Sequence, residues 1–404
     1  MTGFEDRLRD ALAAKAETVR DDGTPRVLPG PAARWSGARL WAPVAVAAAI
    51  VVVVAATVVA TRAVTPPVPA VRPTPPTPSP VGFAPPVRQV WPGAVHEIPA
   101  TAPGGREFRP DVFVSDRVVV GRGLGKNLRD AIYAYDVNKR RFARIAPLPR
   151  DRYGANGPLV FGDLVFGDGY LAWSALRDRD AEIWAVPVAG GVPRRLASFP
   201  ATRTSENQIF AAQNLTVADG MAVWSAQDGG VYRVPLKGGR ADLVSGTKGF
   251  HLAEWPWAGW PRKGSWMDQP VTRPMEHLKN VVTGESRDVK APSGRTSWTD
   301  CGLTWCFNGA EAWRRDGTGL RAFPGRAADV LLSGRFVLLH QSDPTGRRAA
   351  AVHDIATGRT GLLSTPTREG DKPSPPLRLQ DGMAWYRTGH GTQVLVDLTH
   401  AAAR

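Results

Sequence analysis

One apolar stretch stands out in the chain: it runs from Leu40 to Thr61 without a charged residue, between Arg39 and Arg62. A helix of this length extends about 33 Å, which matches the roughly 30 Å hydrocarbon core of a bilayer. A buried soluble helix would show a polar face, and a signal peptide has a shorter apolar region of about 7 to 15 residues after a short basic start. Residues 40–61 are therefore predicted to form one uncleaved transmembrane helix in the lipid bilayer.

The basic residues that flank this stretch indicate its orientation. Three arginines precede it closely, Arg26, Arg34 and Arg39, and two follow it closely, Arg62 and Arg72. The flank with more Lys and Arg usually remains in the cytoplasm. Residues 1–39 are therefore predicted to be cytoplasmic and residues 88–404 extracytoplasmic. The predicted location is thus the cell membrane, with a single pass.

Residues 62–87 follow the predicted helix and are rich in proline. Proline lacks a backbone N–H donor and fixes φ, so this composition supports neither a helix nor a sheet. An extended polyproline conformation would make the segment a semi-rigid linker.

The first residues of the chain carry the signals of a helix start. Thr2 and Glu5 match a capping box, and apolar residues from Phe4 to Val19 recur at helical spacing opposite a charged face. We expect residues 3–20 to form a short amphipathic helix that docks on a cytoplasmic partner or the inner leaflet. The alternative is a tail with no specific partner.

From about residue 88 the pattern changes to short segments of alternating apolar and polar residues, divided by Gly, Asp, Asn and Pro. Such alternation between turn residues is typical of strands, so residues 88–404 are predicted to be all-β. Two segments nearly repeat one another, DGYLAWSA at 168–175 and DGMAVWSA at 219–226, and each is followed by a second strand and a Gly-Gly turn.

Related units start near positions 116, 168, 219, 249, 301, 333 and 381. Their mean spacing is close to the roughly 40 to 50 residues of a propeller blade. A small twisted sheet cannot bury both of its faces alone, so such units stack around an axis. The pattern predicts a β-propeller and favours seven blades, with six as the alternative.

The Gly-Gly turn followed by a leucine, in Gly190–Leu196 and Gly238–Leu243, resembles the repeat of TolB-like β-propellers over about residues 105–400. With the predicted helix and linker, the layout resembles single-pass actinobacterial membrane proteins that carry an extracytoplasmic TolB-like propeller. Some of these proteins are encoded beside extracytoplasmic-function sigma factors, so the resemblance implies a link to sigma-factor signalling and supplies no catalytic residue.

The chain is basic, with 51 Lys and Arg against 37 Asp and Glu and a net charge of +14. Residues 65–404 contribute +12, from 43 basic and 31 acidic residues without a run of five like charges. Arg outnumbers Lys by 42 to 9, a bias expected of a GC-rich bacterial genome. No nucleic-acid-binding motif accompanies the charge, so nucleic acid is not a predicted partner.

Cys301 and Cys306 lie in the predicted extracytoplasmic domain, where an oxidising environment favours a disulfide. Five residues of extended strand would separate their α-carbons by roughly 17 Å, so the bond requires a turn between them. We predict a structural disulfide; a free or redox-active pair is the alternative.

A cluster of tryptophans offers a possible ligand-stacking surface, because exposed indoles stack well on sugar rings. Its members are Trp255, Trp257, Trp260 and Trp266. The competing interpretation is packing between blades, since aromatic side chains dominate buried area in β cores.

The sequence carries no catalytic, cofactor-binding or metal-binding motif: it has no Gly-x-Ser-x-Gly elbow, calcium loop or metal-ligand spacing. The leading hypothesis is a membrane-anchored binding, scaffold or sensor module that takes a protein, peptide or cell-wall component outside. The alternative is a tethered carbohydrate-active hydrolase or lyase, in which paired carboxylates would converge in the propeller channel.

Overall fold

The computed structural model describes residues 82–125, 131–148, 160–177, 180–203, 209–210, 212–261, 273–368, 377–380, 382–388 and 391–402. All of them belong to one compact unit. The predicted cytoplasmic segment 1–39, the predicted span 40–61 and residues 62–81 of the linker lie outside the described residues. Within the described ranges, no helix is long and apolar enough to span a membrane.

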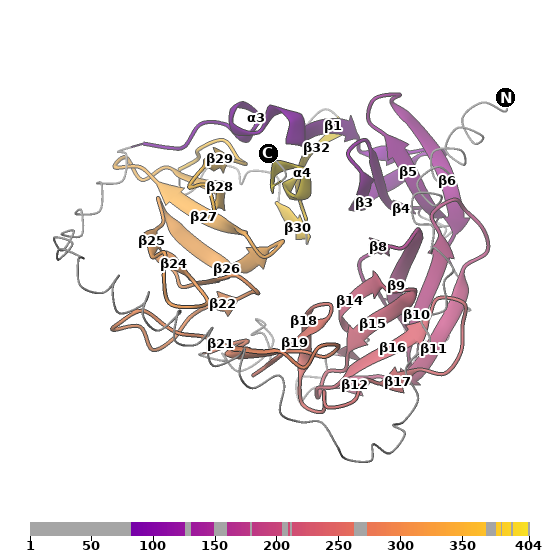
Figure 1. Cartoon of the computed structure of the whole chain (residues 1–404). Coiled ribbons are helices and arrows are strands. Elements are labelled where there is room, and N and C mark those ends of the chain that lie inside the picture. Colours follow the sequence, from indigo (N-terminus) through magenta and orange to yellow (C-terminus); the bar gives the residue numbers. More distant parts are fainter. Residues whose placement is uncertain are drawn as a thin grey trace, which may run out of the picture. The chain divides into compact units, whose positions relative to one another are not determined.

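Seven antiparallel sheets of four or five strands follow one another along the chain, and we number them as blades 1 to 7 (Figure 1). Blade 1 contains β2 (Thr101–Ala102), β3 (Arg106–Ser115), β4 (Val118–Leu124), β5 (Ala131–Asp136) and β6 (Arg141–Pro147). Blade 2 contains β7 (Val160–Phe161), β8 (Val165–Gly167), β9 (Tyr170–Arg177), β10 (Asp180–Pro187) and β11 (Arg194–Pro200). Blade 3 contains β14 (Gln213–Ala218), β15 (Met221–Ser225), β16 (Val231–Pro235) and β17 (Asp242–Leu243).

The remaining blades have four strands each. Blade 4 contains β18 (His251–Glu254), β19 (Trp257–Trp260), β20 (His277–Asn280) and β21 (Ser286–Asp288). Blade 5 contains β22 (Asp300–Cys301), β23 (Trp305–Phe307), β24 (Glu311–Arg314) and β25 (Arg321–Ala322). Blade 6 contains β26 (Arg326–Leu332), β27 (Phe336–Ser342), β28 (Arg348–Asp354) and β29 (Thr360–Leu362). Blade 7 contains β30 (Arg378–Gln380), β31 (Met383–Arg387), β32 (Thr392–Asp397) and, from the other end of the domain, β1 (Val95–Pro99).

Three short helices and one hairpin complete the described structure. They are α3 (Val87–Val90), the 3-10 helix η1 (Pro92–Ala94), α4 (Leu398–Ala402) and the hairpin of β12 (Thr202–Arg203) and β13 (Ile209–Phe210) between blades 2 and 3.

Seven hydrophobic clusters lie between consecutive blades and close the ring. For example, Trp173 of blade 2 packs with Val120 and Ile132 of blade 1. The last interface is equivalent, since Leu395 of blade 7 packs with Phe108 of blade 1. Each sheet therefore buries both faces against its two neighbours, and the domain is an all-β seven-bladed propeller.

The turns between the first and second strands explain most of the sequence repeat. Asp168–Gly169, Asp219–Gly220 and Ser333–Gly334 have positive φ at both positions, which is the geometry of a tight hairpin turn and favours glycine at the second position. Six of the seven expected unit starts coincide with this turn. The start near 249 was wrong, because blade 4 turns at Trp255–Pro256 and has no Asp-Gly or Ser-Gly pair there.

The propeller begins to make contacts before residue 88. The Ala84 N–H donates a 3.1 Å hydrogen bond to Gln341 Oε1, and Leu362 N–H donates a 2.8 Å bond to Pro85 O. Residues 84–87, at the end of the predicted linker, therefore pack on blade 6.

Antiparallel order gives the ring two unlike faces. Connections between first and second strands and between third and fourth strands lie at one end of each blade, and none is longer than 188–193; we call this the tight-turn face. The opposite face carries the connections between second and third strands and those between blades, and we call it the loop face. The strand ends that flank the longest connections lie at this face, and residues 289–299 form the longest connection that the structure describes in full.

Candidate functional site: a depression on the loop face

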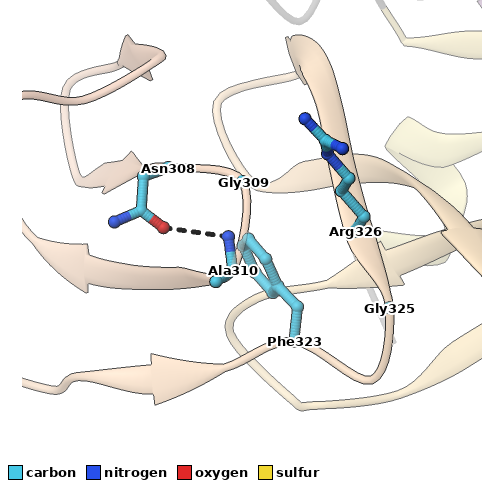
Figure 2. A pocket seen from close by; sticks show the side chains of 6 residues that line it. All are labelled: Asn308, Gly309, Ala310, Phe323, Gly325 and Arg326. Atoms are coloured by element: carbon cyan, nitrogen blue, oxygen red, sulfur yellow. Dashed lines mark hydrogen bonds between the residues drawn. The ribbon is translucent and has the colours of Figure 1, made fainter.

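A depression of about 550 Å³, open to solvent, lies on the loop face between blades 5 and 6 (Figure 2). It is formed by the connection between β23 and β24 and by the connection between β25 and β26. Its lining consists of Asn308, Gly309, Ala310, Phe323, Gly325 and Arg326. Binding residues are commonly carried by connections that a rigid scaffold holds in place, which is the arrangement found here.

Backbone hydrogen bonds fix the wall of the depression that blade 5 provides. Asn308 Oδ1 accepts hydrogen bonds of 2.9 Å from Ala310 N–H and 3.0 Å from Glu311 N–H, which caps the tight connection. Ala327 N–H donates a 2.9 Å bond to Gly309 O, so blade 6 holds the same connection from the other side. The site is consequently preformed.

The floor is the ring of Phe323, which is only 6% exposed. It packs edge-on against Phe307, at 6.3 Å between ring centroids, and against His353, at 5.5 Å. Burial lowers the pKa of His353 to about 4, so this imidazole is neutral at pH 7. The floor is therefore apolar and uncharged.

The segment that carries Phe323 is also held by a hydrogen bond from blade 6. The side chain of Gln341, 4% exposed, donates a 3.0 Å hydrogen bond to Pro324 O and accepts the bond from Ala84 described above. Gln341 thus links the rim of the depression to the residues that enter the propeller from the linker.

The charges around the depression are unevenly matched. Arg295 binds both carboxylate oxygens of Glu311, with Nη2–Oε2 at 2.9 Å, and these hydrogen bonds lower the pKa of Glu311. Arg326 is exposed and lines the depression, and it makes no ion pair with any side chain that the structure describes. Among these side chains, the rim therefore presents one cation without an ion-pair partner, above an apolar floor.

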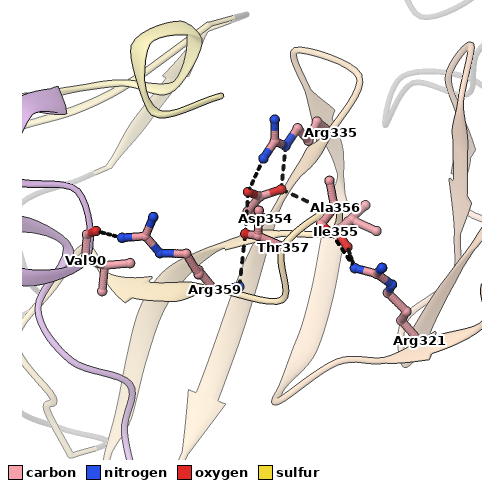
Figure 3. Close-up of polar contacts among 8 residues, drawn as sticks. All are labelled: Val90, Arg321, Arg335, Asp354, Ile355, Ala356, Thr357 and Arg359. Atoms are coloured by element: carbon pink, nitrogen blue, oxygen red, sulfur yellow. Dashed lines mark hydrogen bonds and ion pairs between the residues drawn. The ribbon is translucent and has the colours of Figure 1, made fainter. Parts of the chain in front are cut away.

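A second polar cluster, on the tight-turn face, is already saturated (Figure 3). Asp354 accepts two 2.6 Å hydrogen bonds from Arg335 and one from the Thr357 hydroxyl; burial opposes ionisation, but these bonds keep the pKa of Asp354 below its usual value. Arg321 of blade 5 donates to Ile355 O and Ala356 O at 2.5 and 2.6 Å. Another arginine of the cluster, Arg359, bonds Val90 O of α3. These contacts clamp blade 6 to its neighbours and leave no acceptor for a ligand.

The structure separates the predicted stacking tryptophans. Trp255 lies in the turn between β18 and β19 and donates a 2.7 Å hydrogen bond to Asp219 on the tight-turn face. Trp257 is 7% exposed, with the guanidinium of Arg287 4.2 Å from its ring centroid. Trp260, 55% exposed, lies at the loop-face end of β19, and Trp266 lies outside the described residues. The four do not form one platform within the described residues, and a stacking role for each stays a prediction.

Cys301 and Cys306 are brought together. They face each other on the paired strands β22 and β23, with 4.0 Å between α-carbons and a disulfide between their sulfur atoms. The intervening residues form the turn that the bond requires. Formation of this bond in the native protein stays a prediction with a direct chemical test.

Two of the buried acids in the described part of the chain, Asp111 and Glu182, are held by nearby donors. Asp111 is fully buried and forms a two-point contact with Arg122, and burial raises its pKa. Glu182, also buried, accepts a 3.0 Å bond from Arg195 and a 2.9 Å bond from the Trp184 indole. Each carboxylate is thus engaged by local donors, and none of this geometry favours glycoside cleavage over binding.

The lining residues of the depression were not anticipated from the sequence. Asn308-Gly309 is a turn signal that places a connection there, and this was the one available clue. Arg326 is one arginine among 42, and its lack of an ion-pair partner among the described residues becomes visible only when blades 5 and 6 are assembled.

No protein-family model matches the sequence, and no curated protein matches it. Solved structures match its fold. YCF48 bound to D1 peptide is 9% identical, with 75% of this chain and 95% of that chain covered and a TM-score of 0.39. BamB from Moraxella catarrhalis is 9% identical over 72% of this chain and 86% of that chain, with a TM-score of 0.36. TolB from Acinetobacter baumannii is 12% identical over 67% of this chain and 60% of that chain, with a TM-score of 0.26. These similarities concern the β-propeller fold alone.

Proposed function

We propose that the chain is a membrane-anchored, extracytoplasmic propeller that binds a protein, peptide or cell-wall component on its loop face and acts as a scaffold or sensor. One observation carries the proposal. The tight-turn face has short turns, some joined between blades by hydrogen bonds, whereas the loop face carries the depression, whose Arg326 has no ion-pair partner among the described side chains. A rigid ring with variable connections on one face is suited to recognition.

The membrane part of the proposal rests on the apolar stretch 40–61 and on its flanking arginines. We further propose that residues 3–20 contact a cytoplasmic partner, which would connect external binding to an internal response such as sigma-factor signalling. This link rests on the resemblance of the layout and on the amphipathic pattern of those residues.

The lysines of the chain allow the topology to be tested without any substitution. Lys15 is the one lysine before the proposed span, and the other eight lie between Lys126 and Lys372. A membrane-impermeant amine reagent applied to intact cells is expected to label lysines of the second group and to leave Lys15 unlabelled until the cells are opened. Labelling of Lys15 alone in intact cells would indicate the opposite orientation. Equal labelling of both groups would contradict the proposed membrane anchor.

The binding face can be tested by site-specific photo-crosslinking in the full-length protein. A photoreactive amino acid is placed at Ala310, which is exposed on the loop face, or at Arg240, whose side chain is 92% exposed on the tight-turn face. We expect cross-linked partners from position 310 and few from position 240. The reverse distribution would contradict the assignment of the loop face as the binding face.

A further inference from the structure

We propose that the depression between blades 5 and 6 binds an acidic peptide segment, with a carboxylate on Arg326 and an adjacent apolar side chain on Phe323. This inference rests on the proposed binding function and deepens it, because it names the site and the chemistry of the partner.

The charge of Arg326 determines the first half of the recognition. Its guanidinium lies on the rim and has no carboxylate partner among the side chains that the structure describes, while the neighbouring acid Glu311 is held by Arg295. A guanidinium has five donors and no acceptor, and its planar fork matches a carboxylate with two parallel hydrogen bonds. The unmatched group in this depression therefore selects an acid.

The floor determines the second half. Phe323 and Ala310 offer an apolar surface, and the neutral His353 beneath Phe323 adds no charge. A volume of about 550 Å³ is within the usual range of ligand sites and accommodates one or two side chains. An apolar side chain next to the carboxylate would cover the floor and exclude water from the ion pair.

The number of free cations favours a peptide over a polyanion. A phosphate-rich or sulfated polymer is normally held by several cations, whereas Arg326 is the single arginine that lines the depression and Arg295 is engaged by Glu311. The net charge of +12 on residues 65–404 would still attract an acidic segment from solution.

The preformed walls reduce the cost of binding. Asn308 caps its own connection, Ala327 N–H holds Gly309 O, and Gln341 holds Pro324 O, so no described contact has to break before a ligand enters. Rigid sites lose less conformational entropy on association.

The test is a selection of displayed random peptides on the full-length protein in detergent. Three proteins are used: the native chain, Arg326→Gln, and Arg233→Gln as a matched control on an exposed site of β16. We expect peptides selected on the native chain to be enriched in Asp or Glu beside an apolar residue. We expect Arg326→Gln to weaken their binding by about tenfold or more, and Arg233→Gln to leave it unchanged.

Several outcomes would overturn the inference. Selected peptides without acidic enrichment, or acidic peptides that bind Arg326→Gln as well as they bind the native chain, would exclude the depression while leaving the binding function in place. Arg326-dependent binding of inorganic polyphosphate without binding of acidic peptides would replace the peptide by a polyanion. Failure to select any peptide, together with an absence of cross-links from position 310, would count against the binding function itself.

Folding of the variants is checked separately. Arg326 is exposed and makes no described ion pair. The melting temperature of Arg326→Gln is therefore expected to equal that of the native chain within measurement error. A second variant, Ala310→Trp, fills the depression with an uncharged side chain and leaves the native cation in place. It should also weaken the acidic peptides, and unchanged binding would contradict the proposed location.

Discussion

Asp168 accepts a 2.8 Å hydrogen bond from the backbone N–H of Gly220, which lies in the equivalent turn of the next blade. The neighbouring Asp219 in turn accepts a 2.7 Å bond from the indole of Trp255, in the equivalent turn of the blade after that. Blades 2, 3 and 4 are thus joined by side chains at the tight-turn face, in addition to their apolar contacts.

Replacement of Asp168 by alanine should reduce the free energy of unfolding by about 1–2 kcal/mol, since it removes an acceptor and places alanine at a φ of 49°. Asn keeps an acceptor oxygen and tolerates this φ, so Asp168→Asn is the matched control and should lose less. Urea unfolding of both variants measures the difference, and equal stability of the two would contradict this account.

The buried pair of Asp111 and Arg122 should be far more sensitive. Arg122 is 4% exposed and Asp111 fully buried, so Arg122→Met leaves an uncompensated buried carboxyl and should cost about 3–5 kcal/mol. Arg117 makes an exposed ion pair with Asp116 at 3.3 Å, and Arg117→Met should cost about 0–1 kcal/mol. The denaturant midpoints of the two variants measure the difference. Similar losses of unfolding free energy would show that the buried pair contributes no more to stability than an exposed one.

His353 should make the stability of the propeller depend on pH. Its pKa is about 4 in the folded chain against 6.5 for an unperturbed histidine, because burial disfavours the charged form. The unfolded chain therefore takes up the proton first, so stability is complete above about pH 6.5 and decreases as the pH falls toward 4, by up to about 3 kcal/mol.

The variant His353→Gln should flatten this pH profile, whereas His340→Gln, on an exposed site of β27, should leave it unchanged. Burial also lowers the pKa of His96, so a smaller slope of the same sign should remain. Urea midpoints at pH 7.5 and pH 5 supply the measurement. Identical slopes for the native chain and His353→Gln would refute the assignment.

The cysteine pair gives a chemical prediction. Both cysteines are buried, so the protein is alkylated in denaturant: without reductant no mass should be added at Cys301 or Cys306, and after reduction two groups should be added. Replacement of both residues by alanine should lower stability by roughly 2 kcal/mol on the loop-entropy estimate for so short a loop. Intact mass spectrometry decides the matter, and two reactive thiols in fresh protein would exclude the disulfide.

The tryptophans of blade 4 should separate into two classes. Trp257 is buried, so Trp257→Ala should cost about 3–5 kcal/mol, whereas Trp260 is largely exposed and Trp260→Ala should change stability by less than about 0.5 kcal/mol. If either indole stacks on a ligand, Trp260 is the one available. Retained sugar binding by Trp260→Ala would exclude Trp260 as the stacking residue and leave Trp255, whose indole is bonded to Asp219, as the other partly exposed candidate that is described.

The repeat was predictable because its turns impose a strict local requirement. Asp168-Gly169 and Asp219-Gly220 adopt positive φ at both positions, and few residue pairs do so readily. Blade 4 obeys the same topology with Trp255–Pro256, so its turn carried no such signal and its start was misplaced at 249. The number of blades could still be inferred, because it depends on how many repeated units the sequence contains and not on where each unit starts.

The candidate site was much less predictable. Phe323 and Arg326 are ordinary residues in a basic chain, and their importance depends on which neighbours they acquire. Glu311 is about equally far in sequence from Arg326 and from Arg295, yet it forms its ion pair with Arg295. Pair formation between blades is a tertiary property, and one sequence does not determine which cation will remain unmatched.

The pairing of β1 with β32 determines when the ring can close during synthesis. β1 emerges first among the strands, and its partner follows after roughly 300 residues, which takes roughly 15–60 s at typical elongation rates. During that interval the edge of β1 is open to other chains. The sequence of β1 includes His96, Glu97 and Pro99, which are poor templates for accidental strand pairing. The ring can therefore close only after β32 has been synthesised, and a chain that lacks β32 would leave the edges of β1 and of its last sheet unpaired.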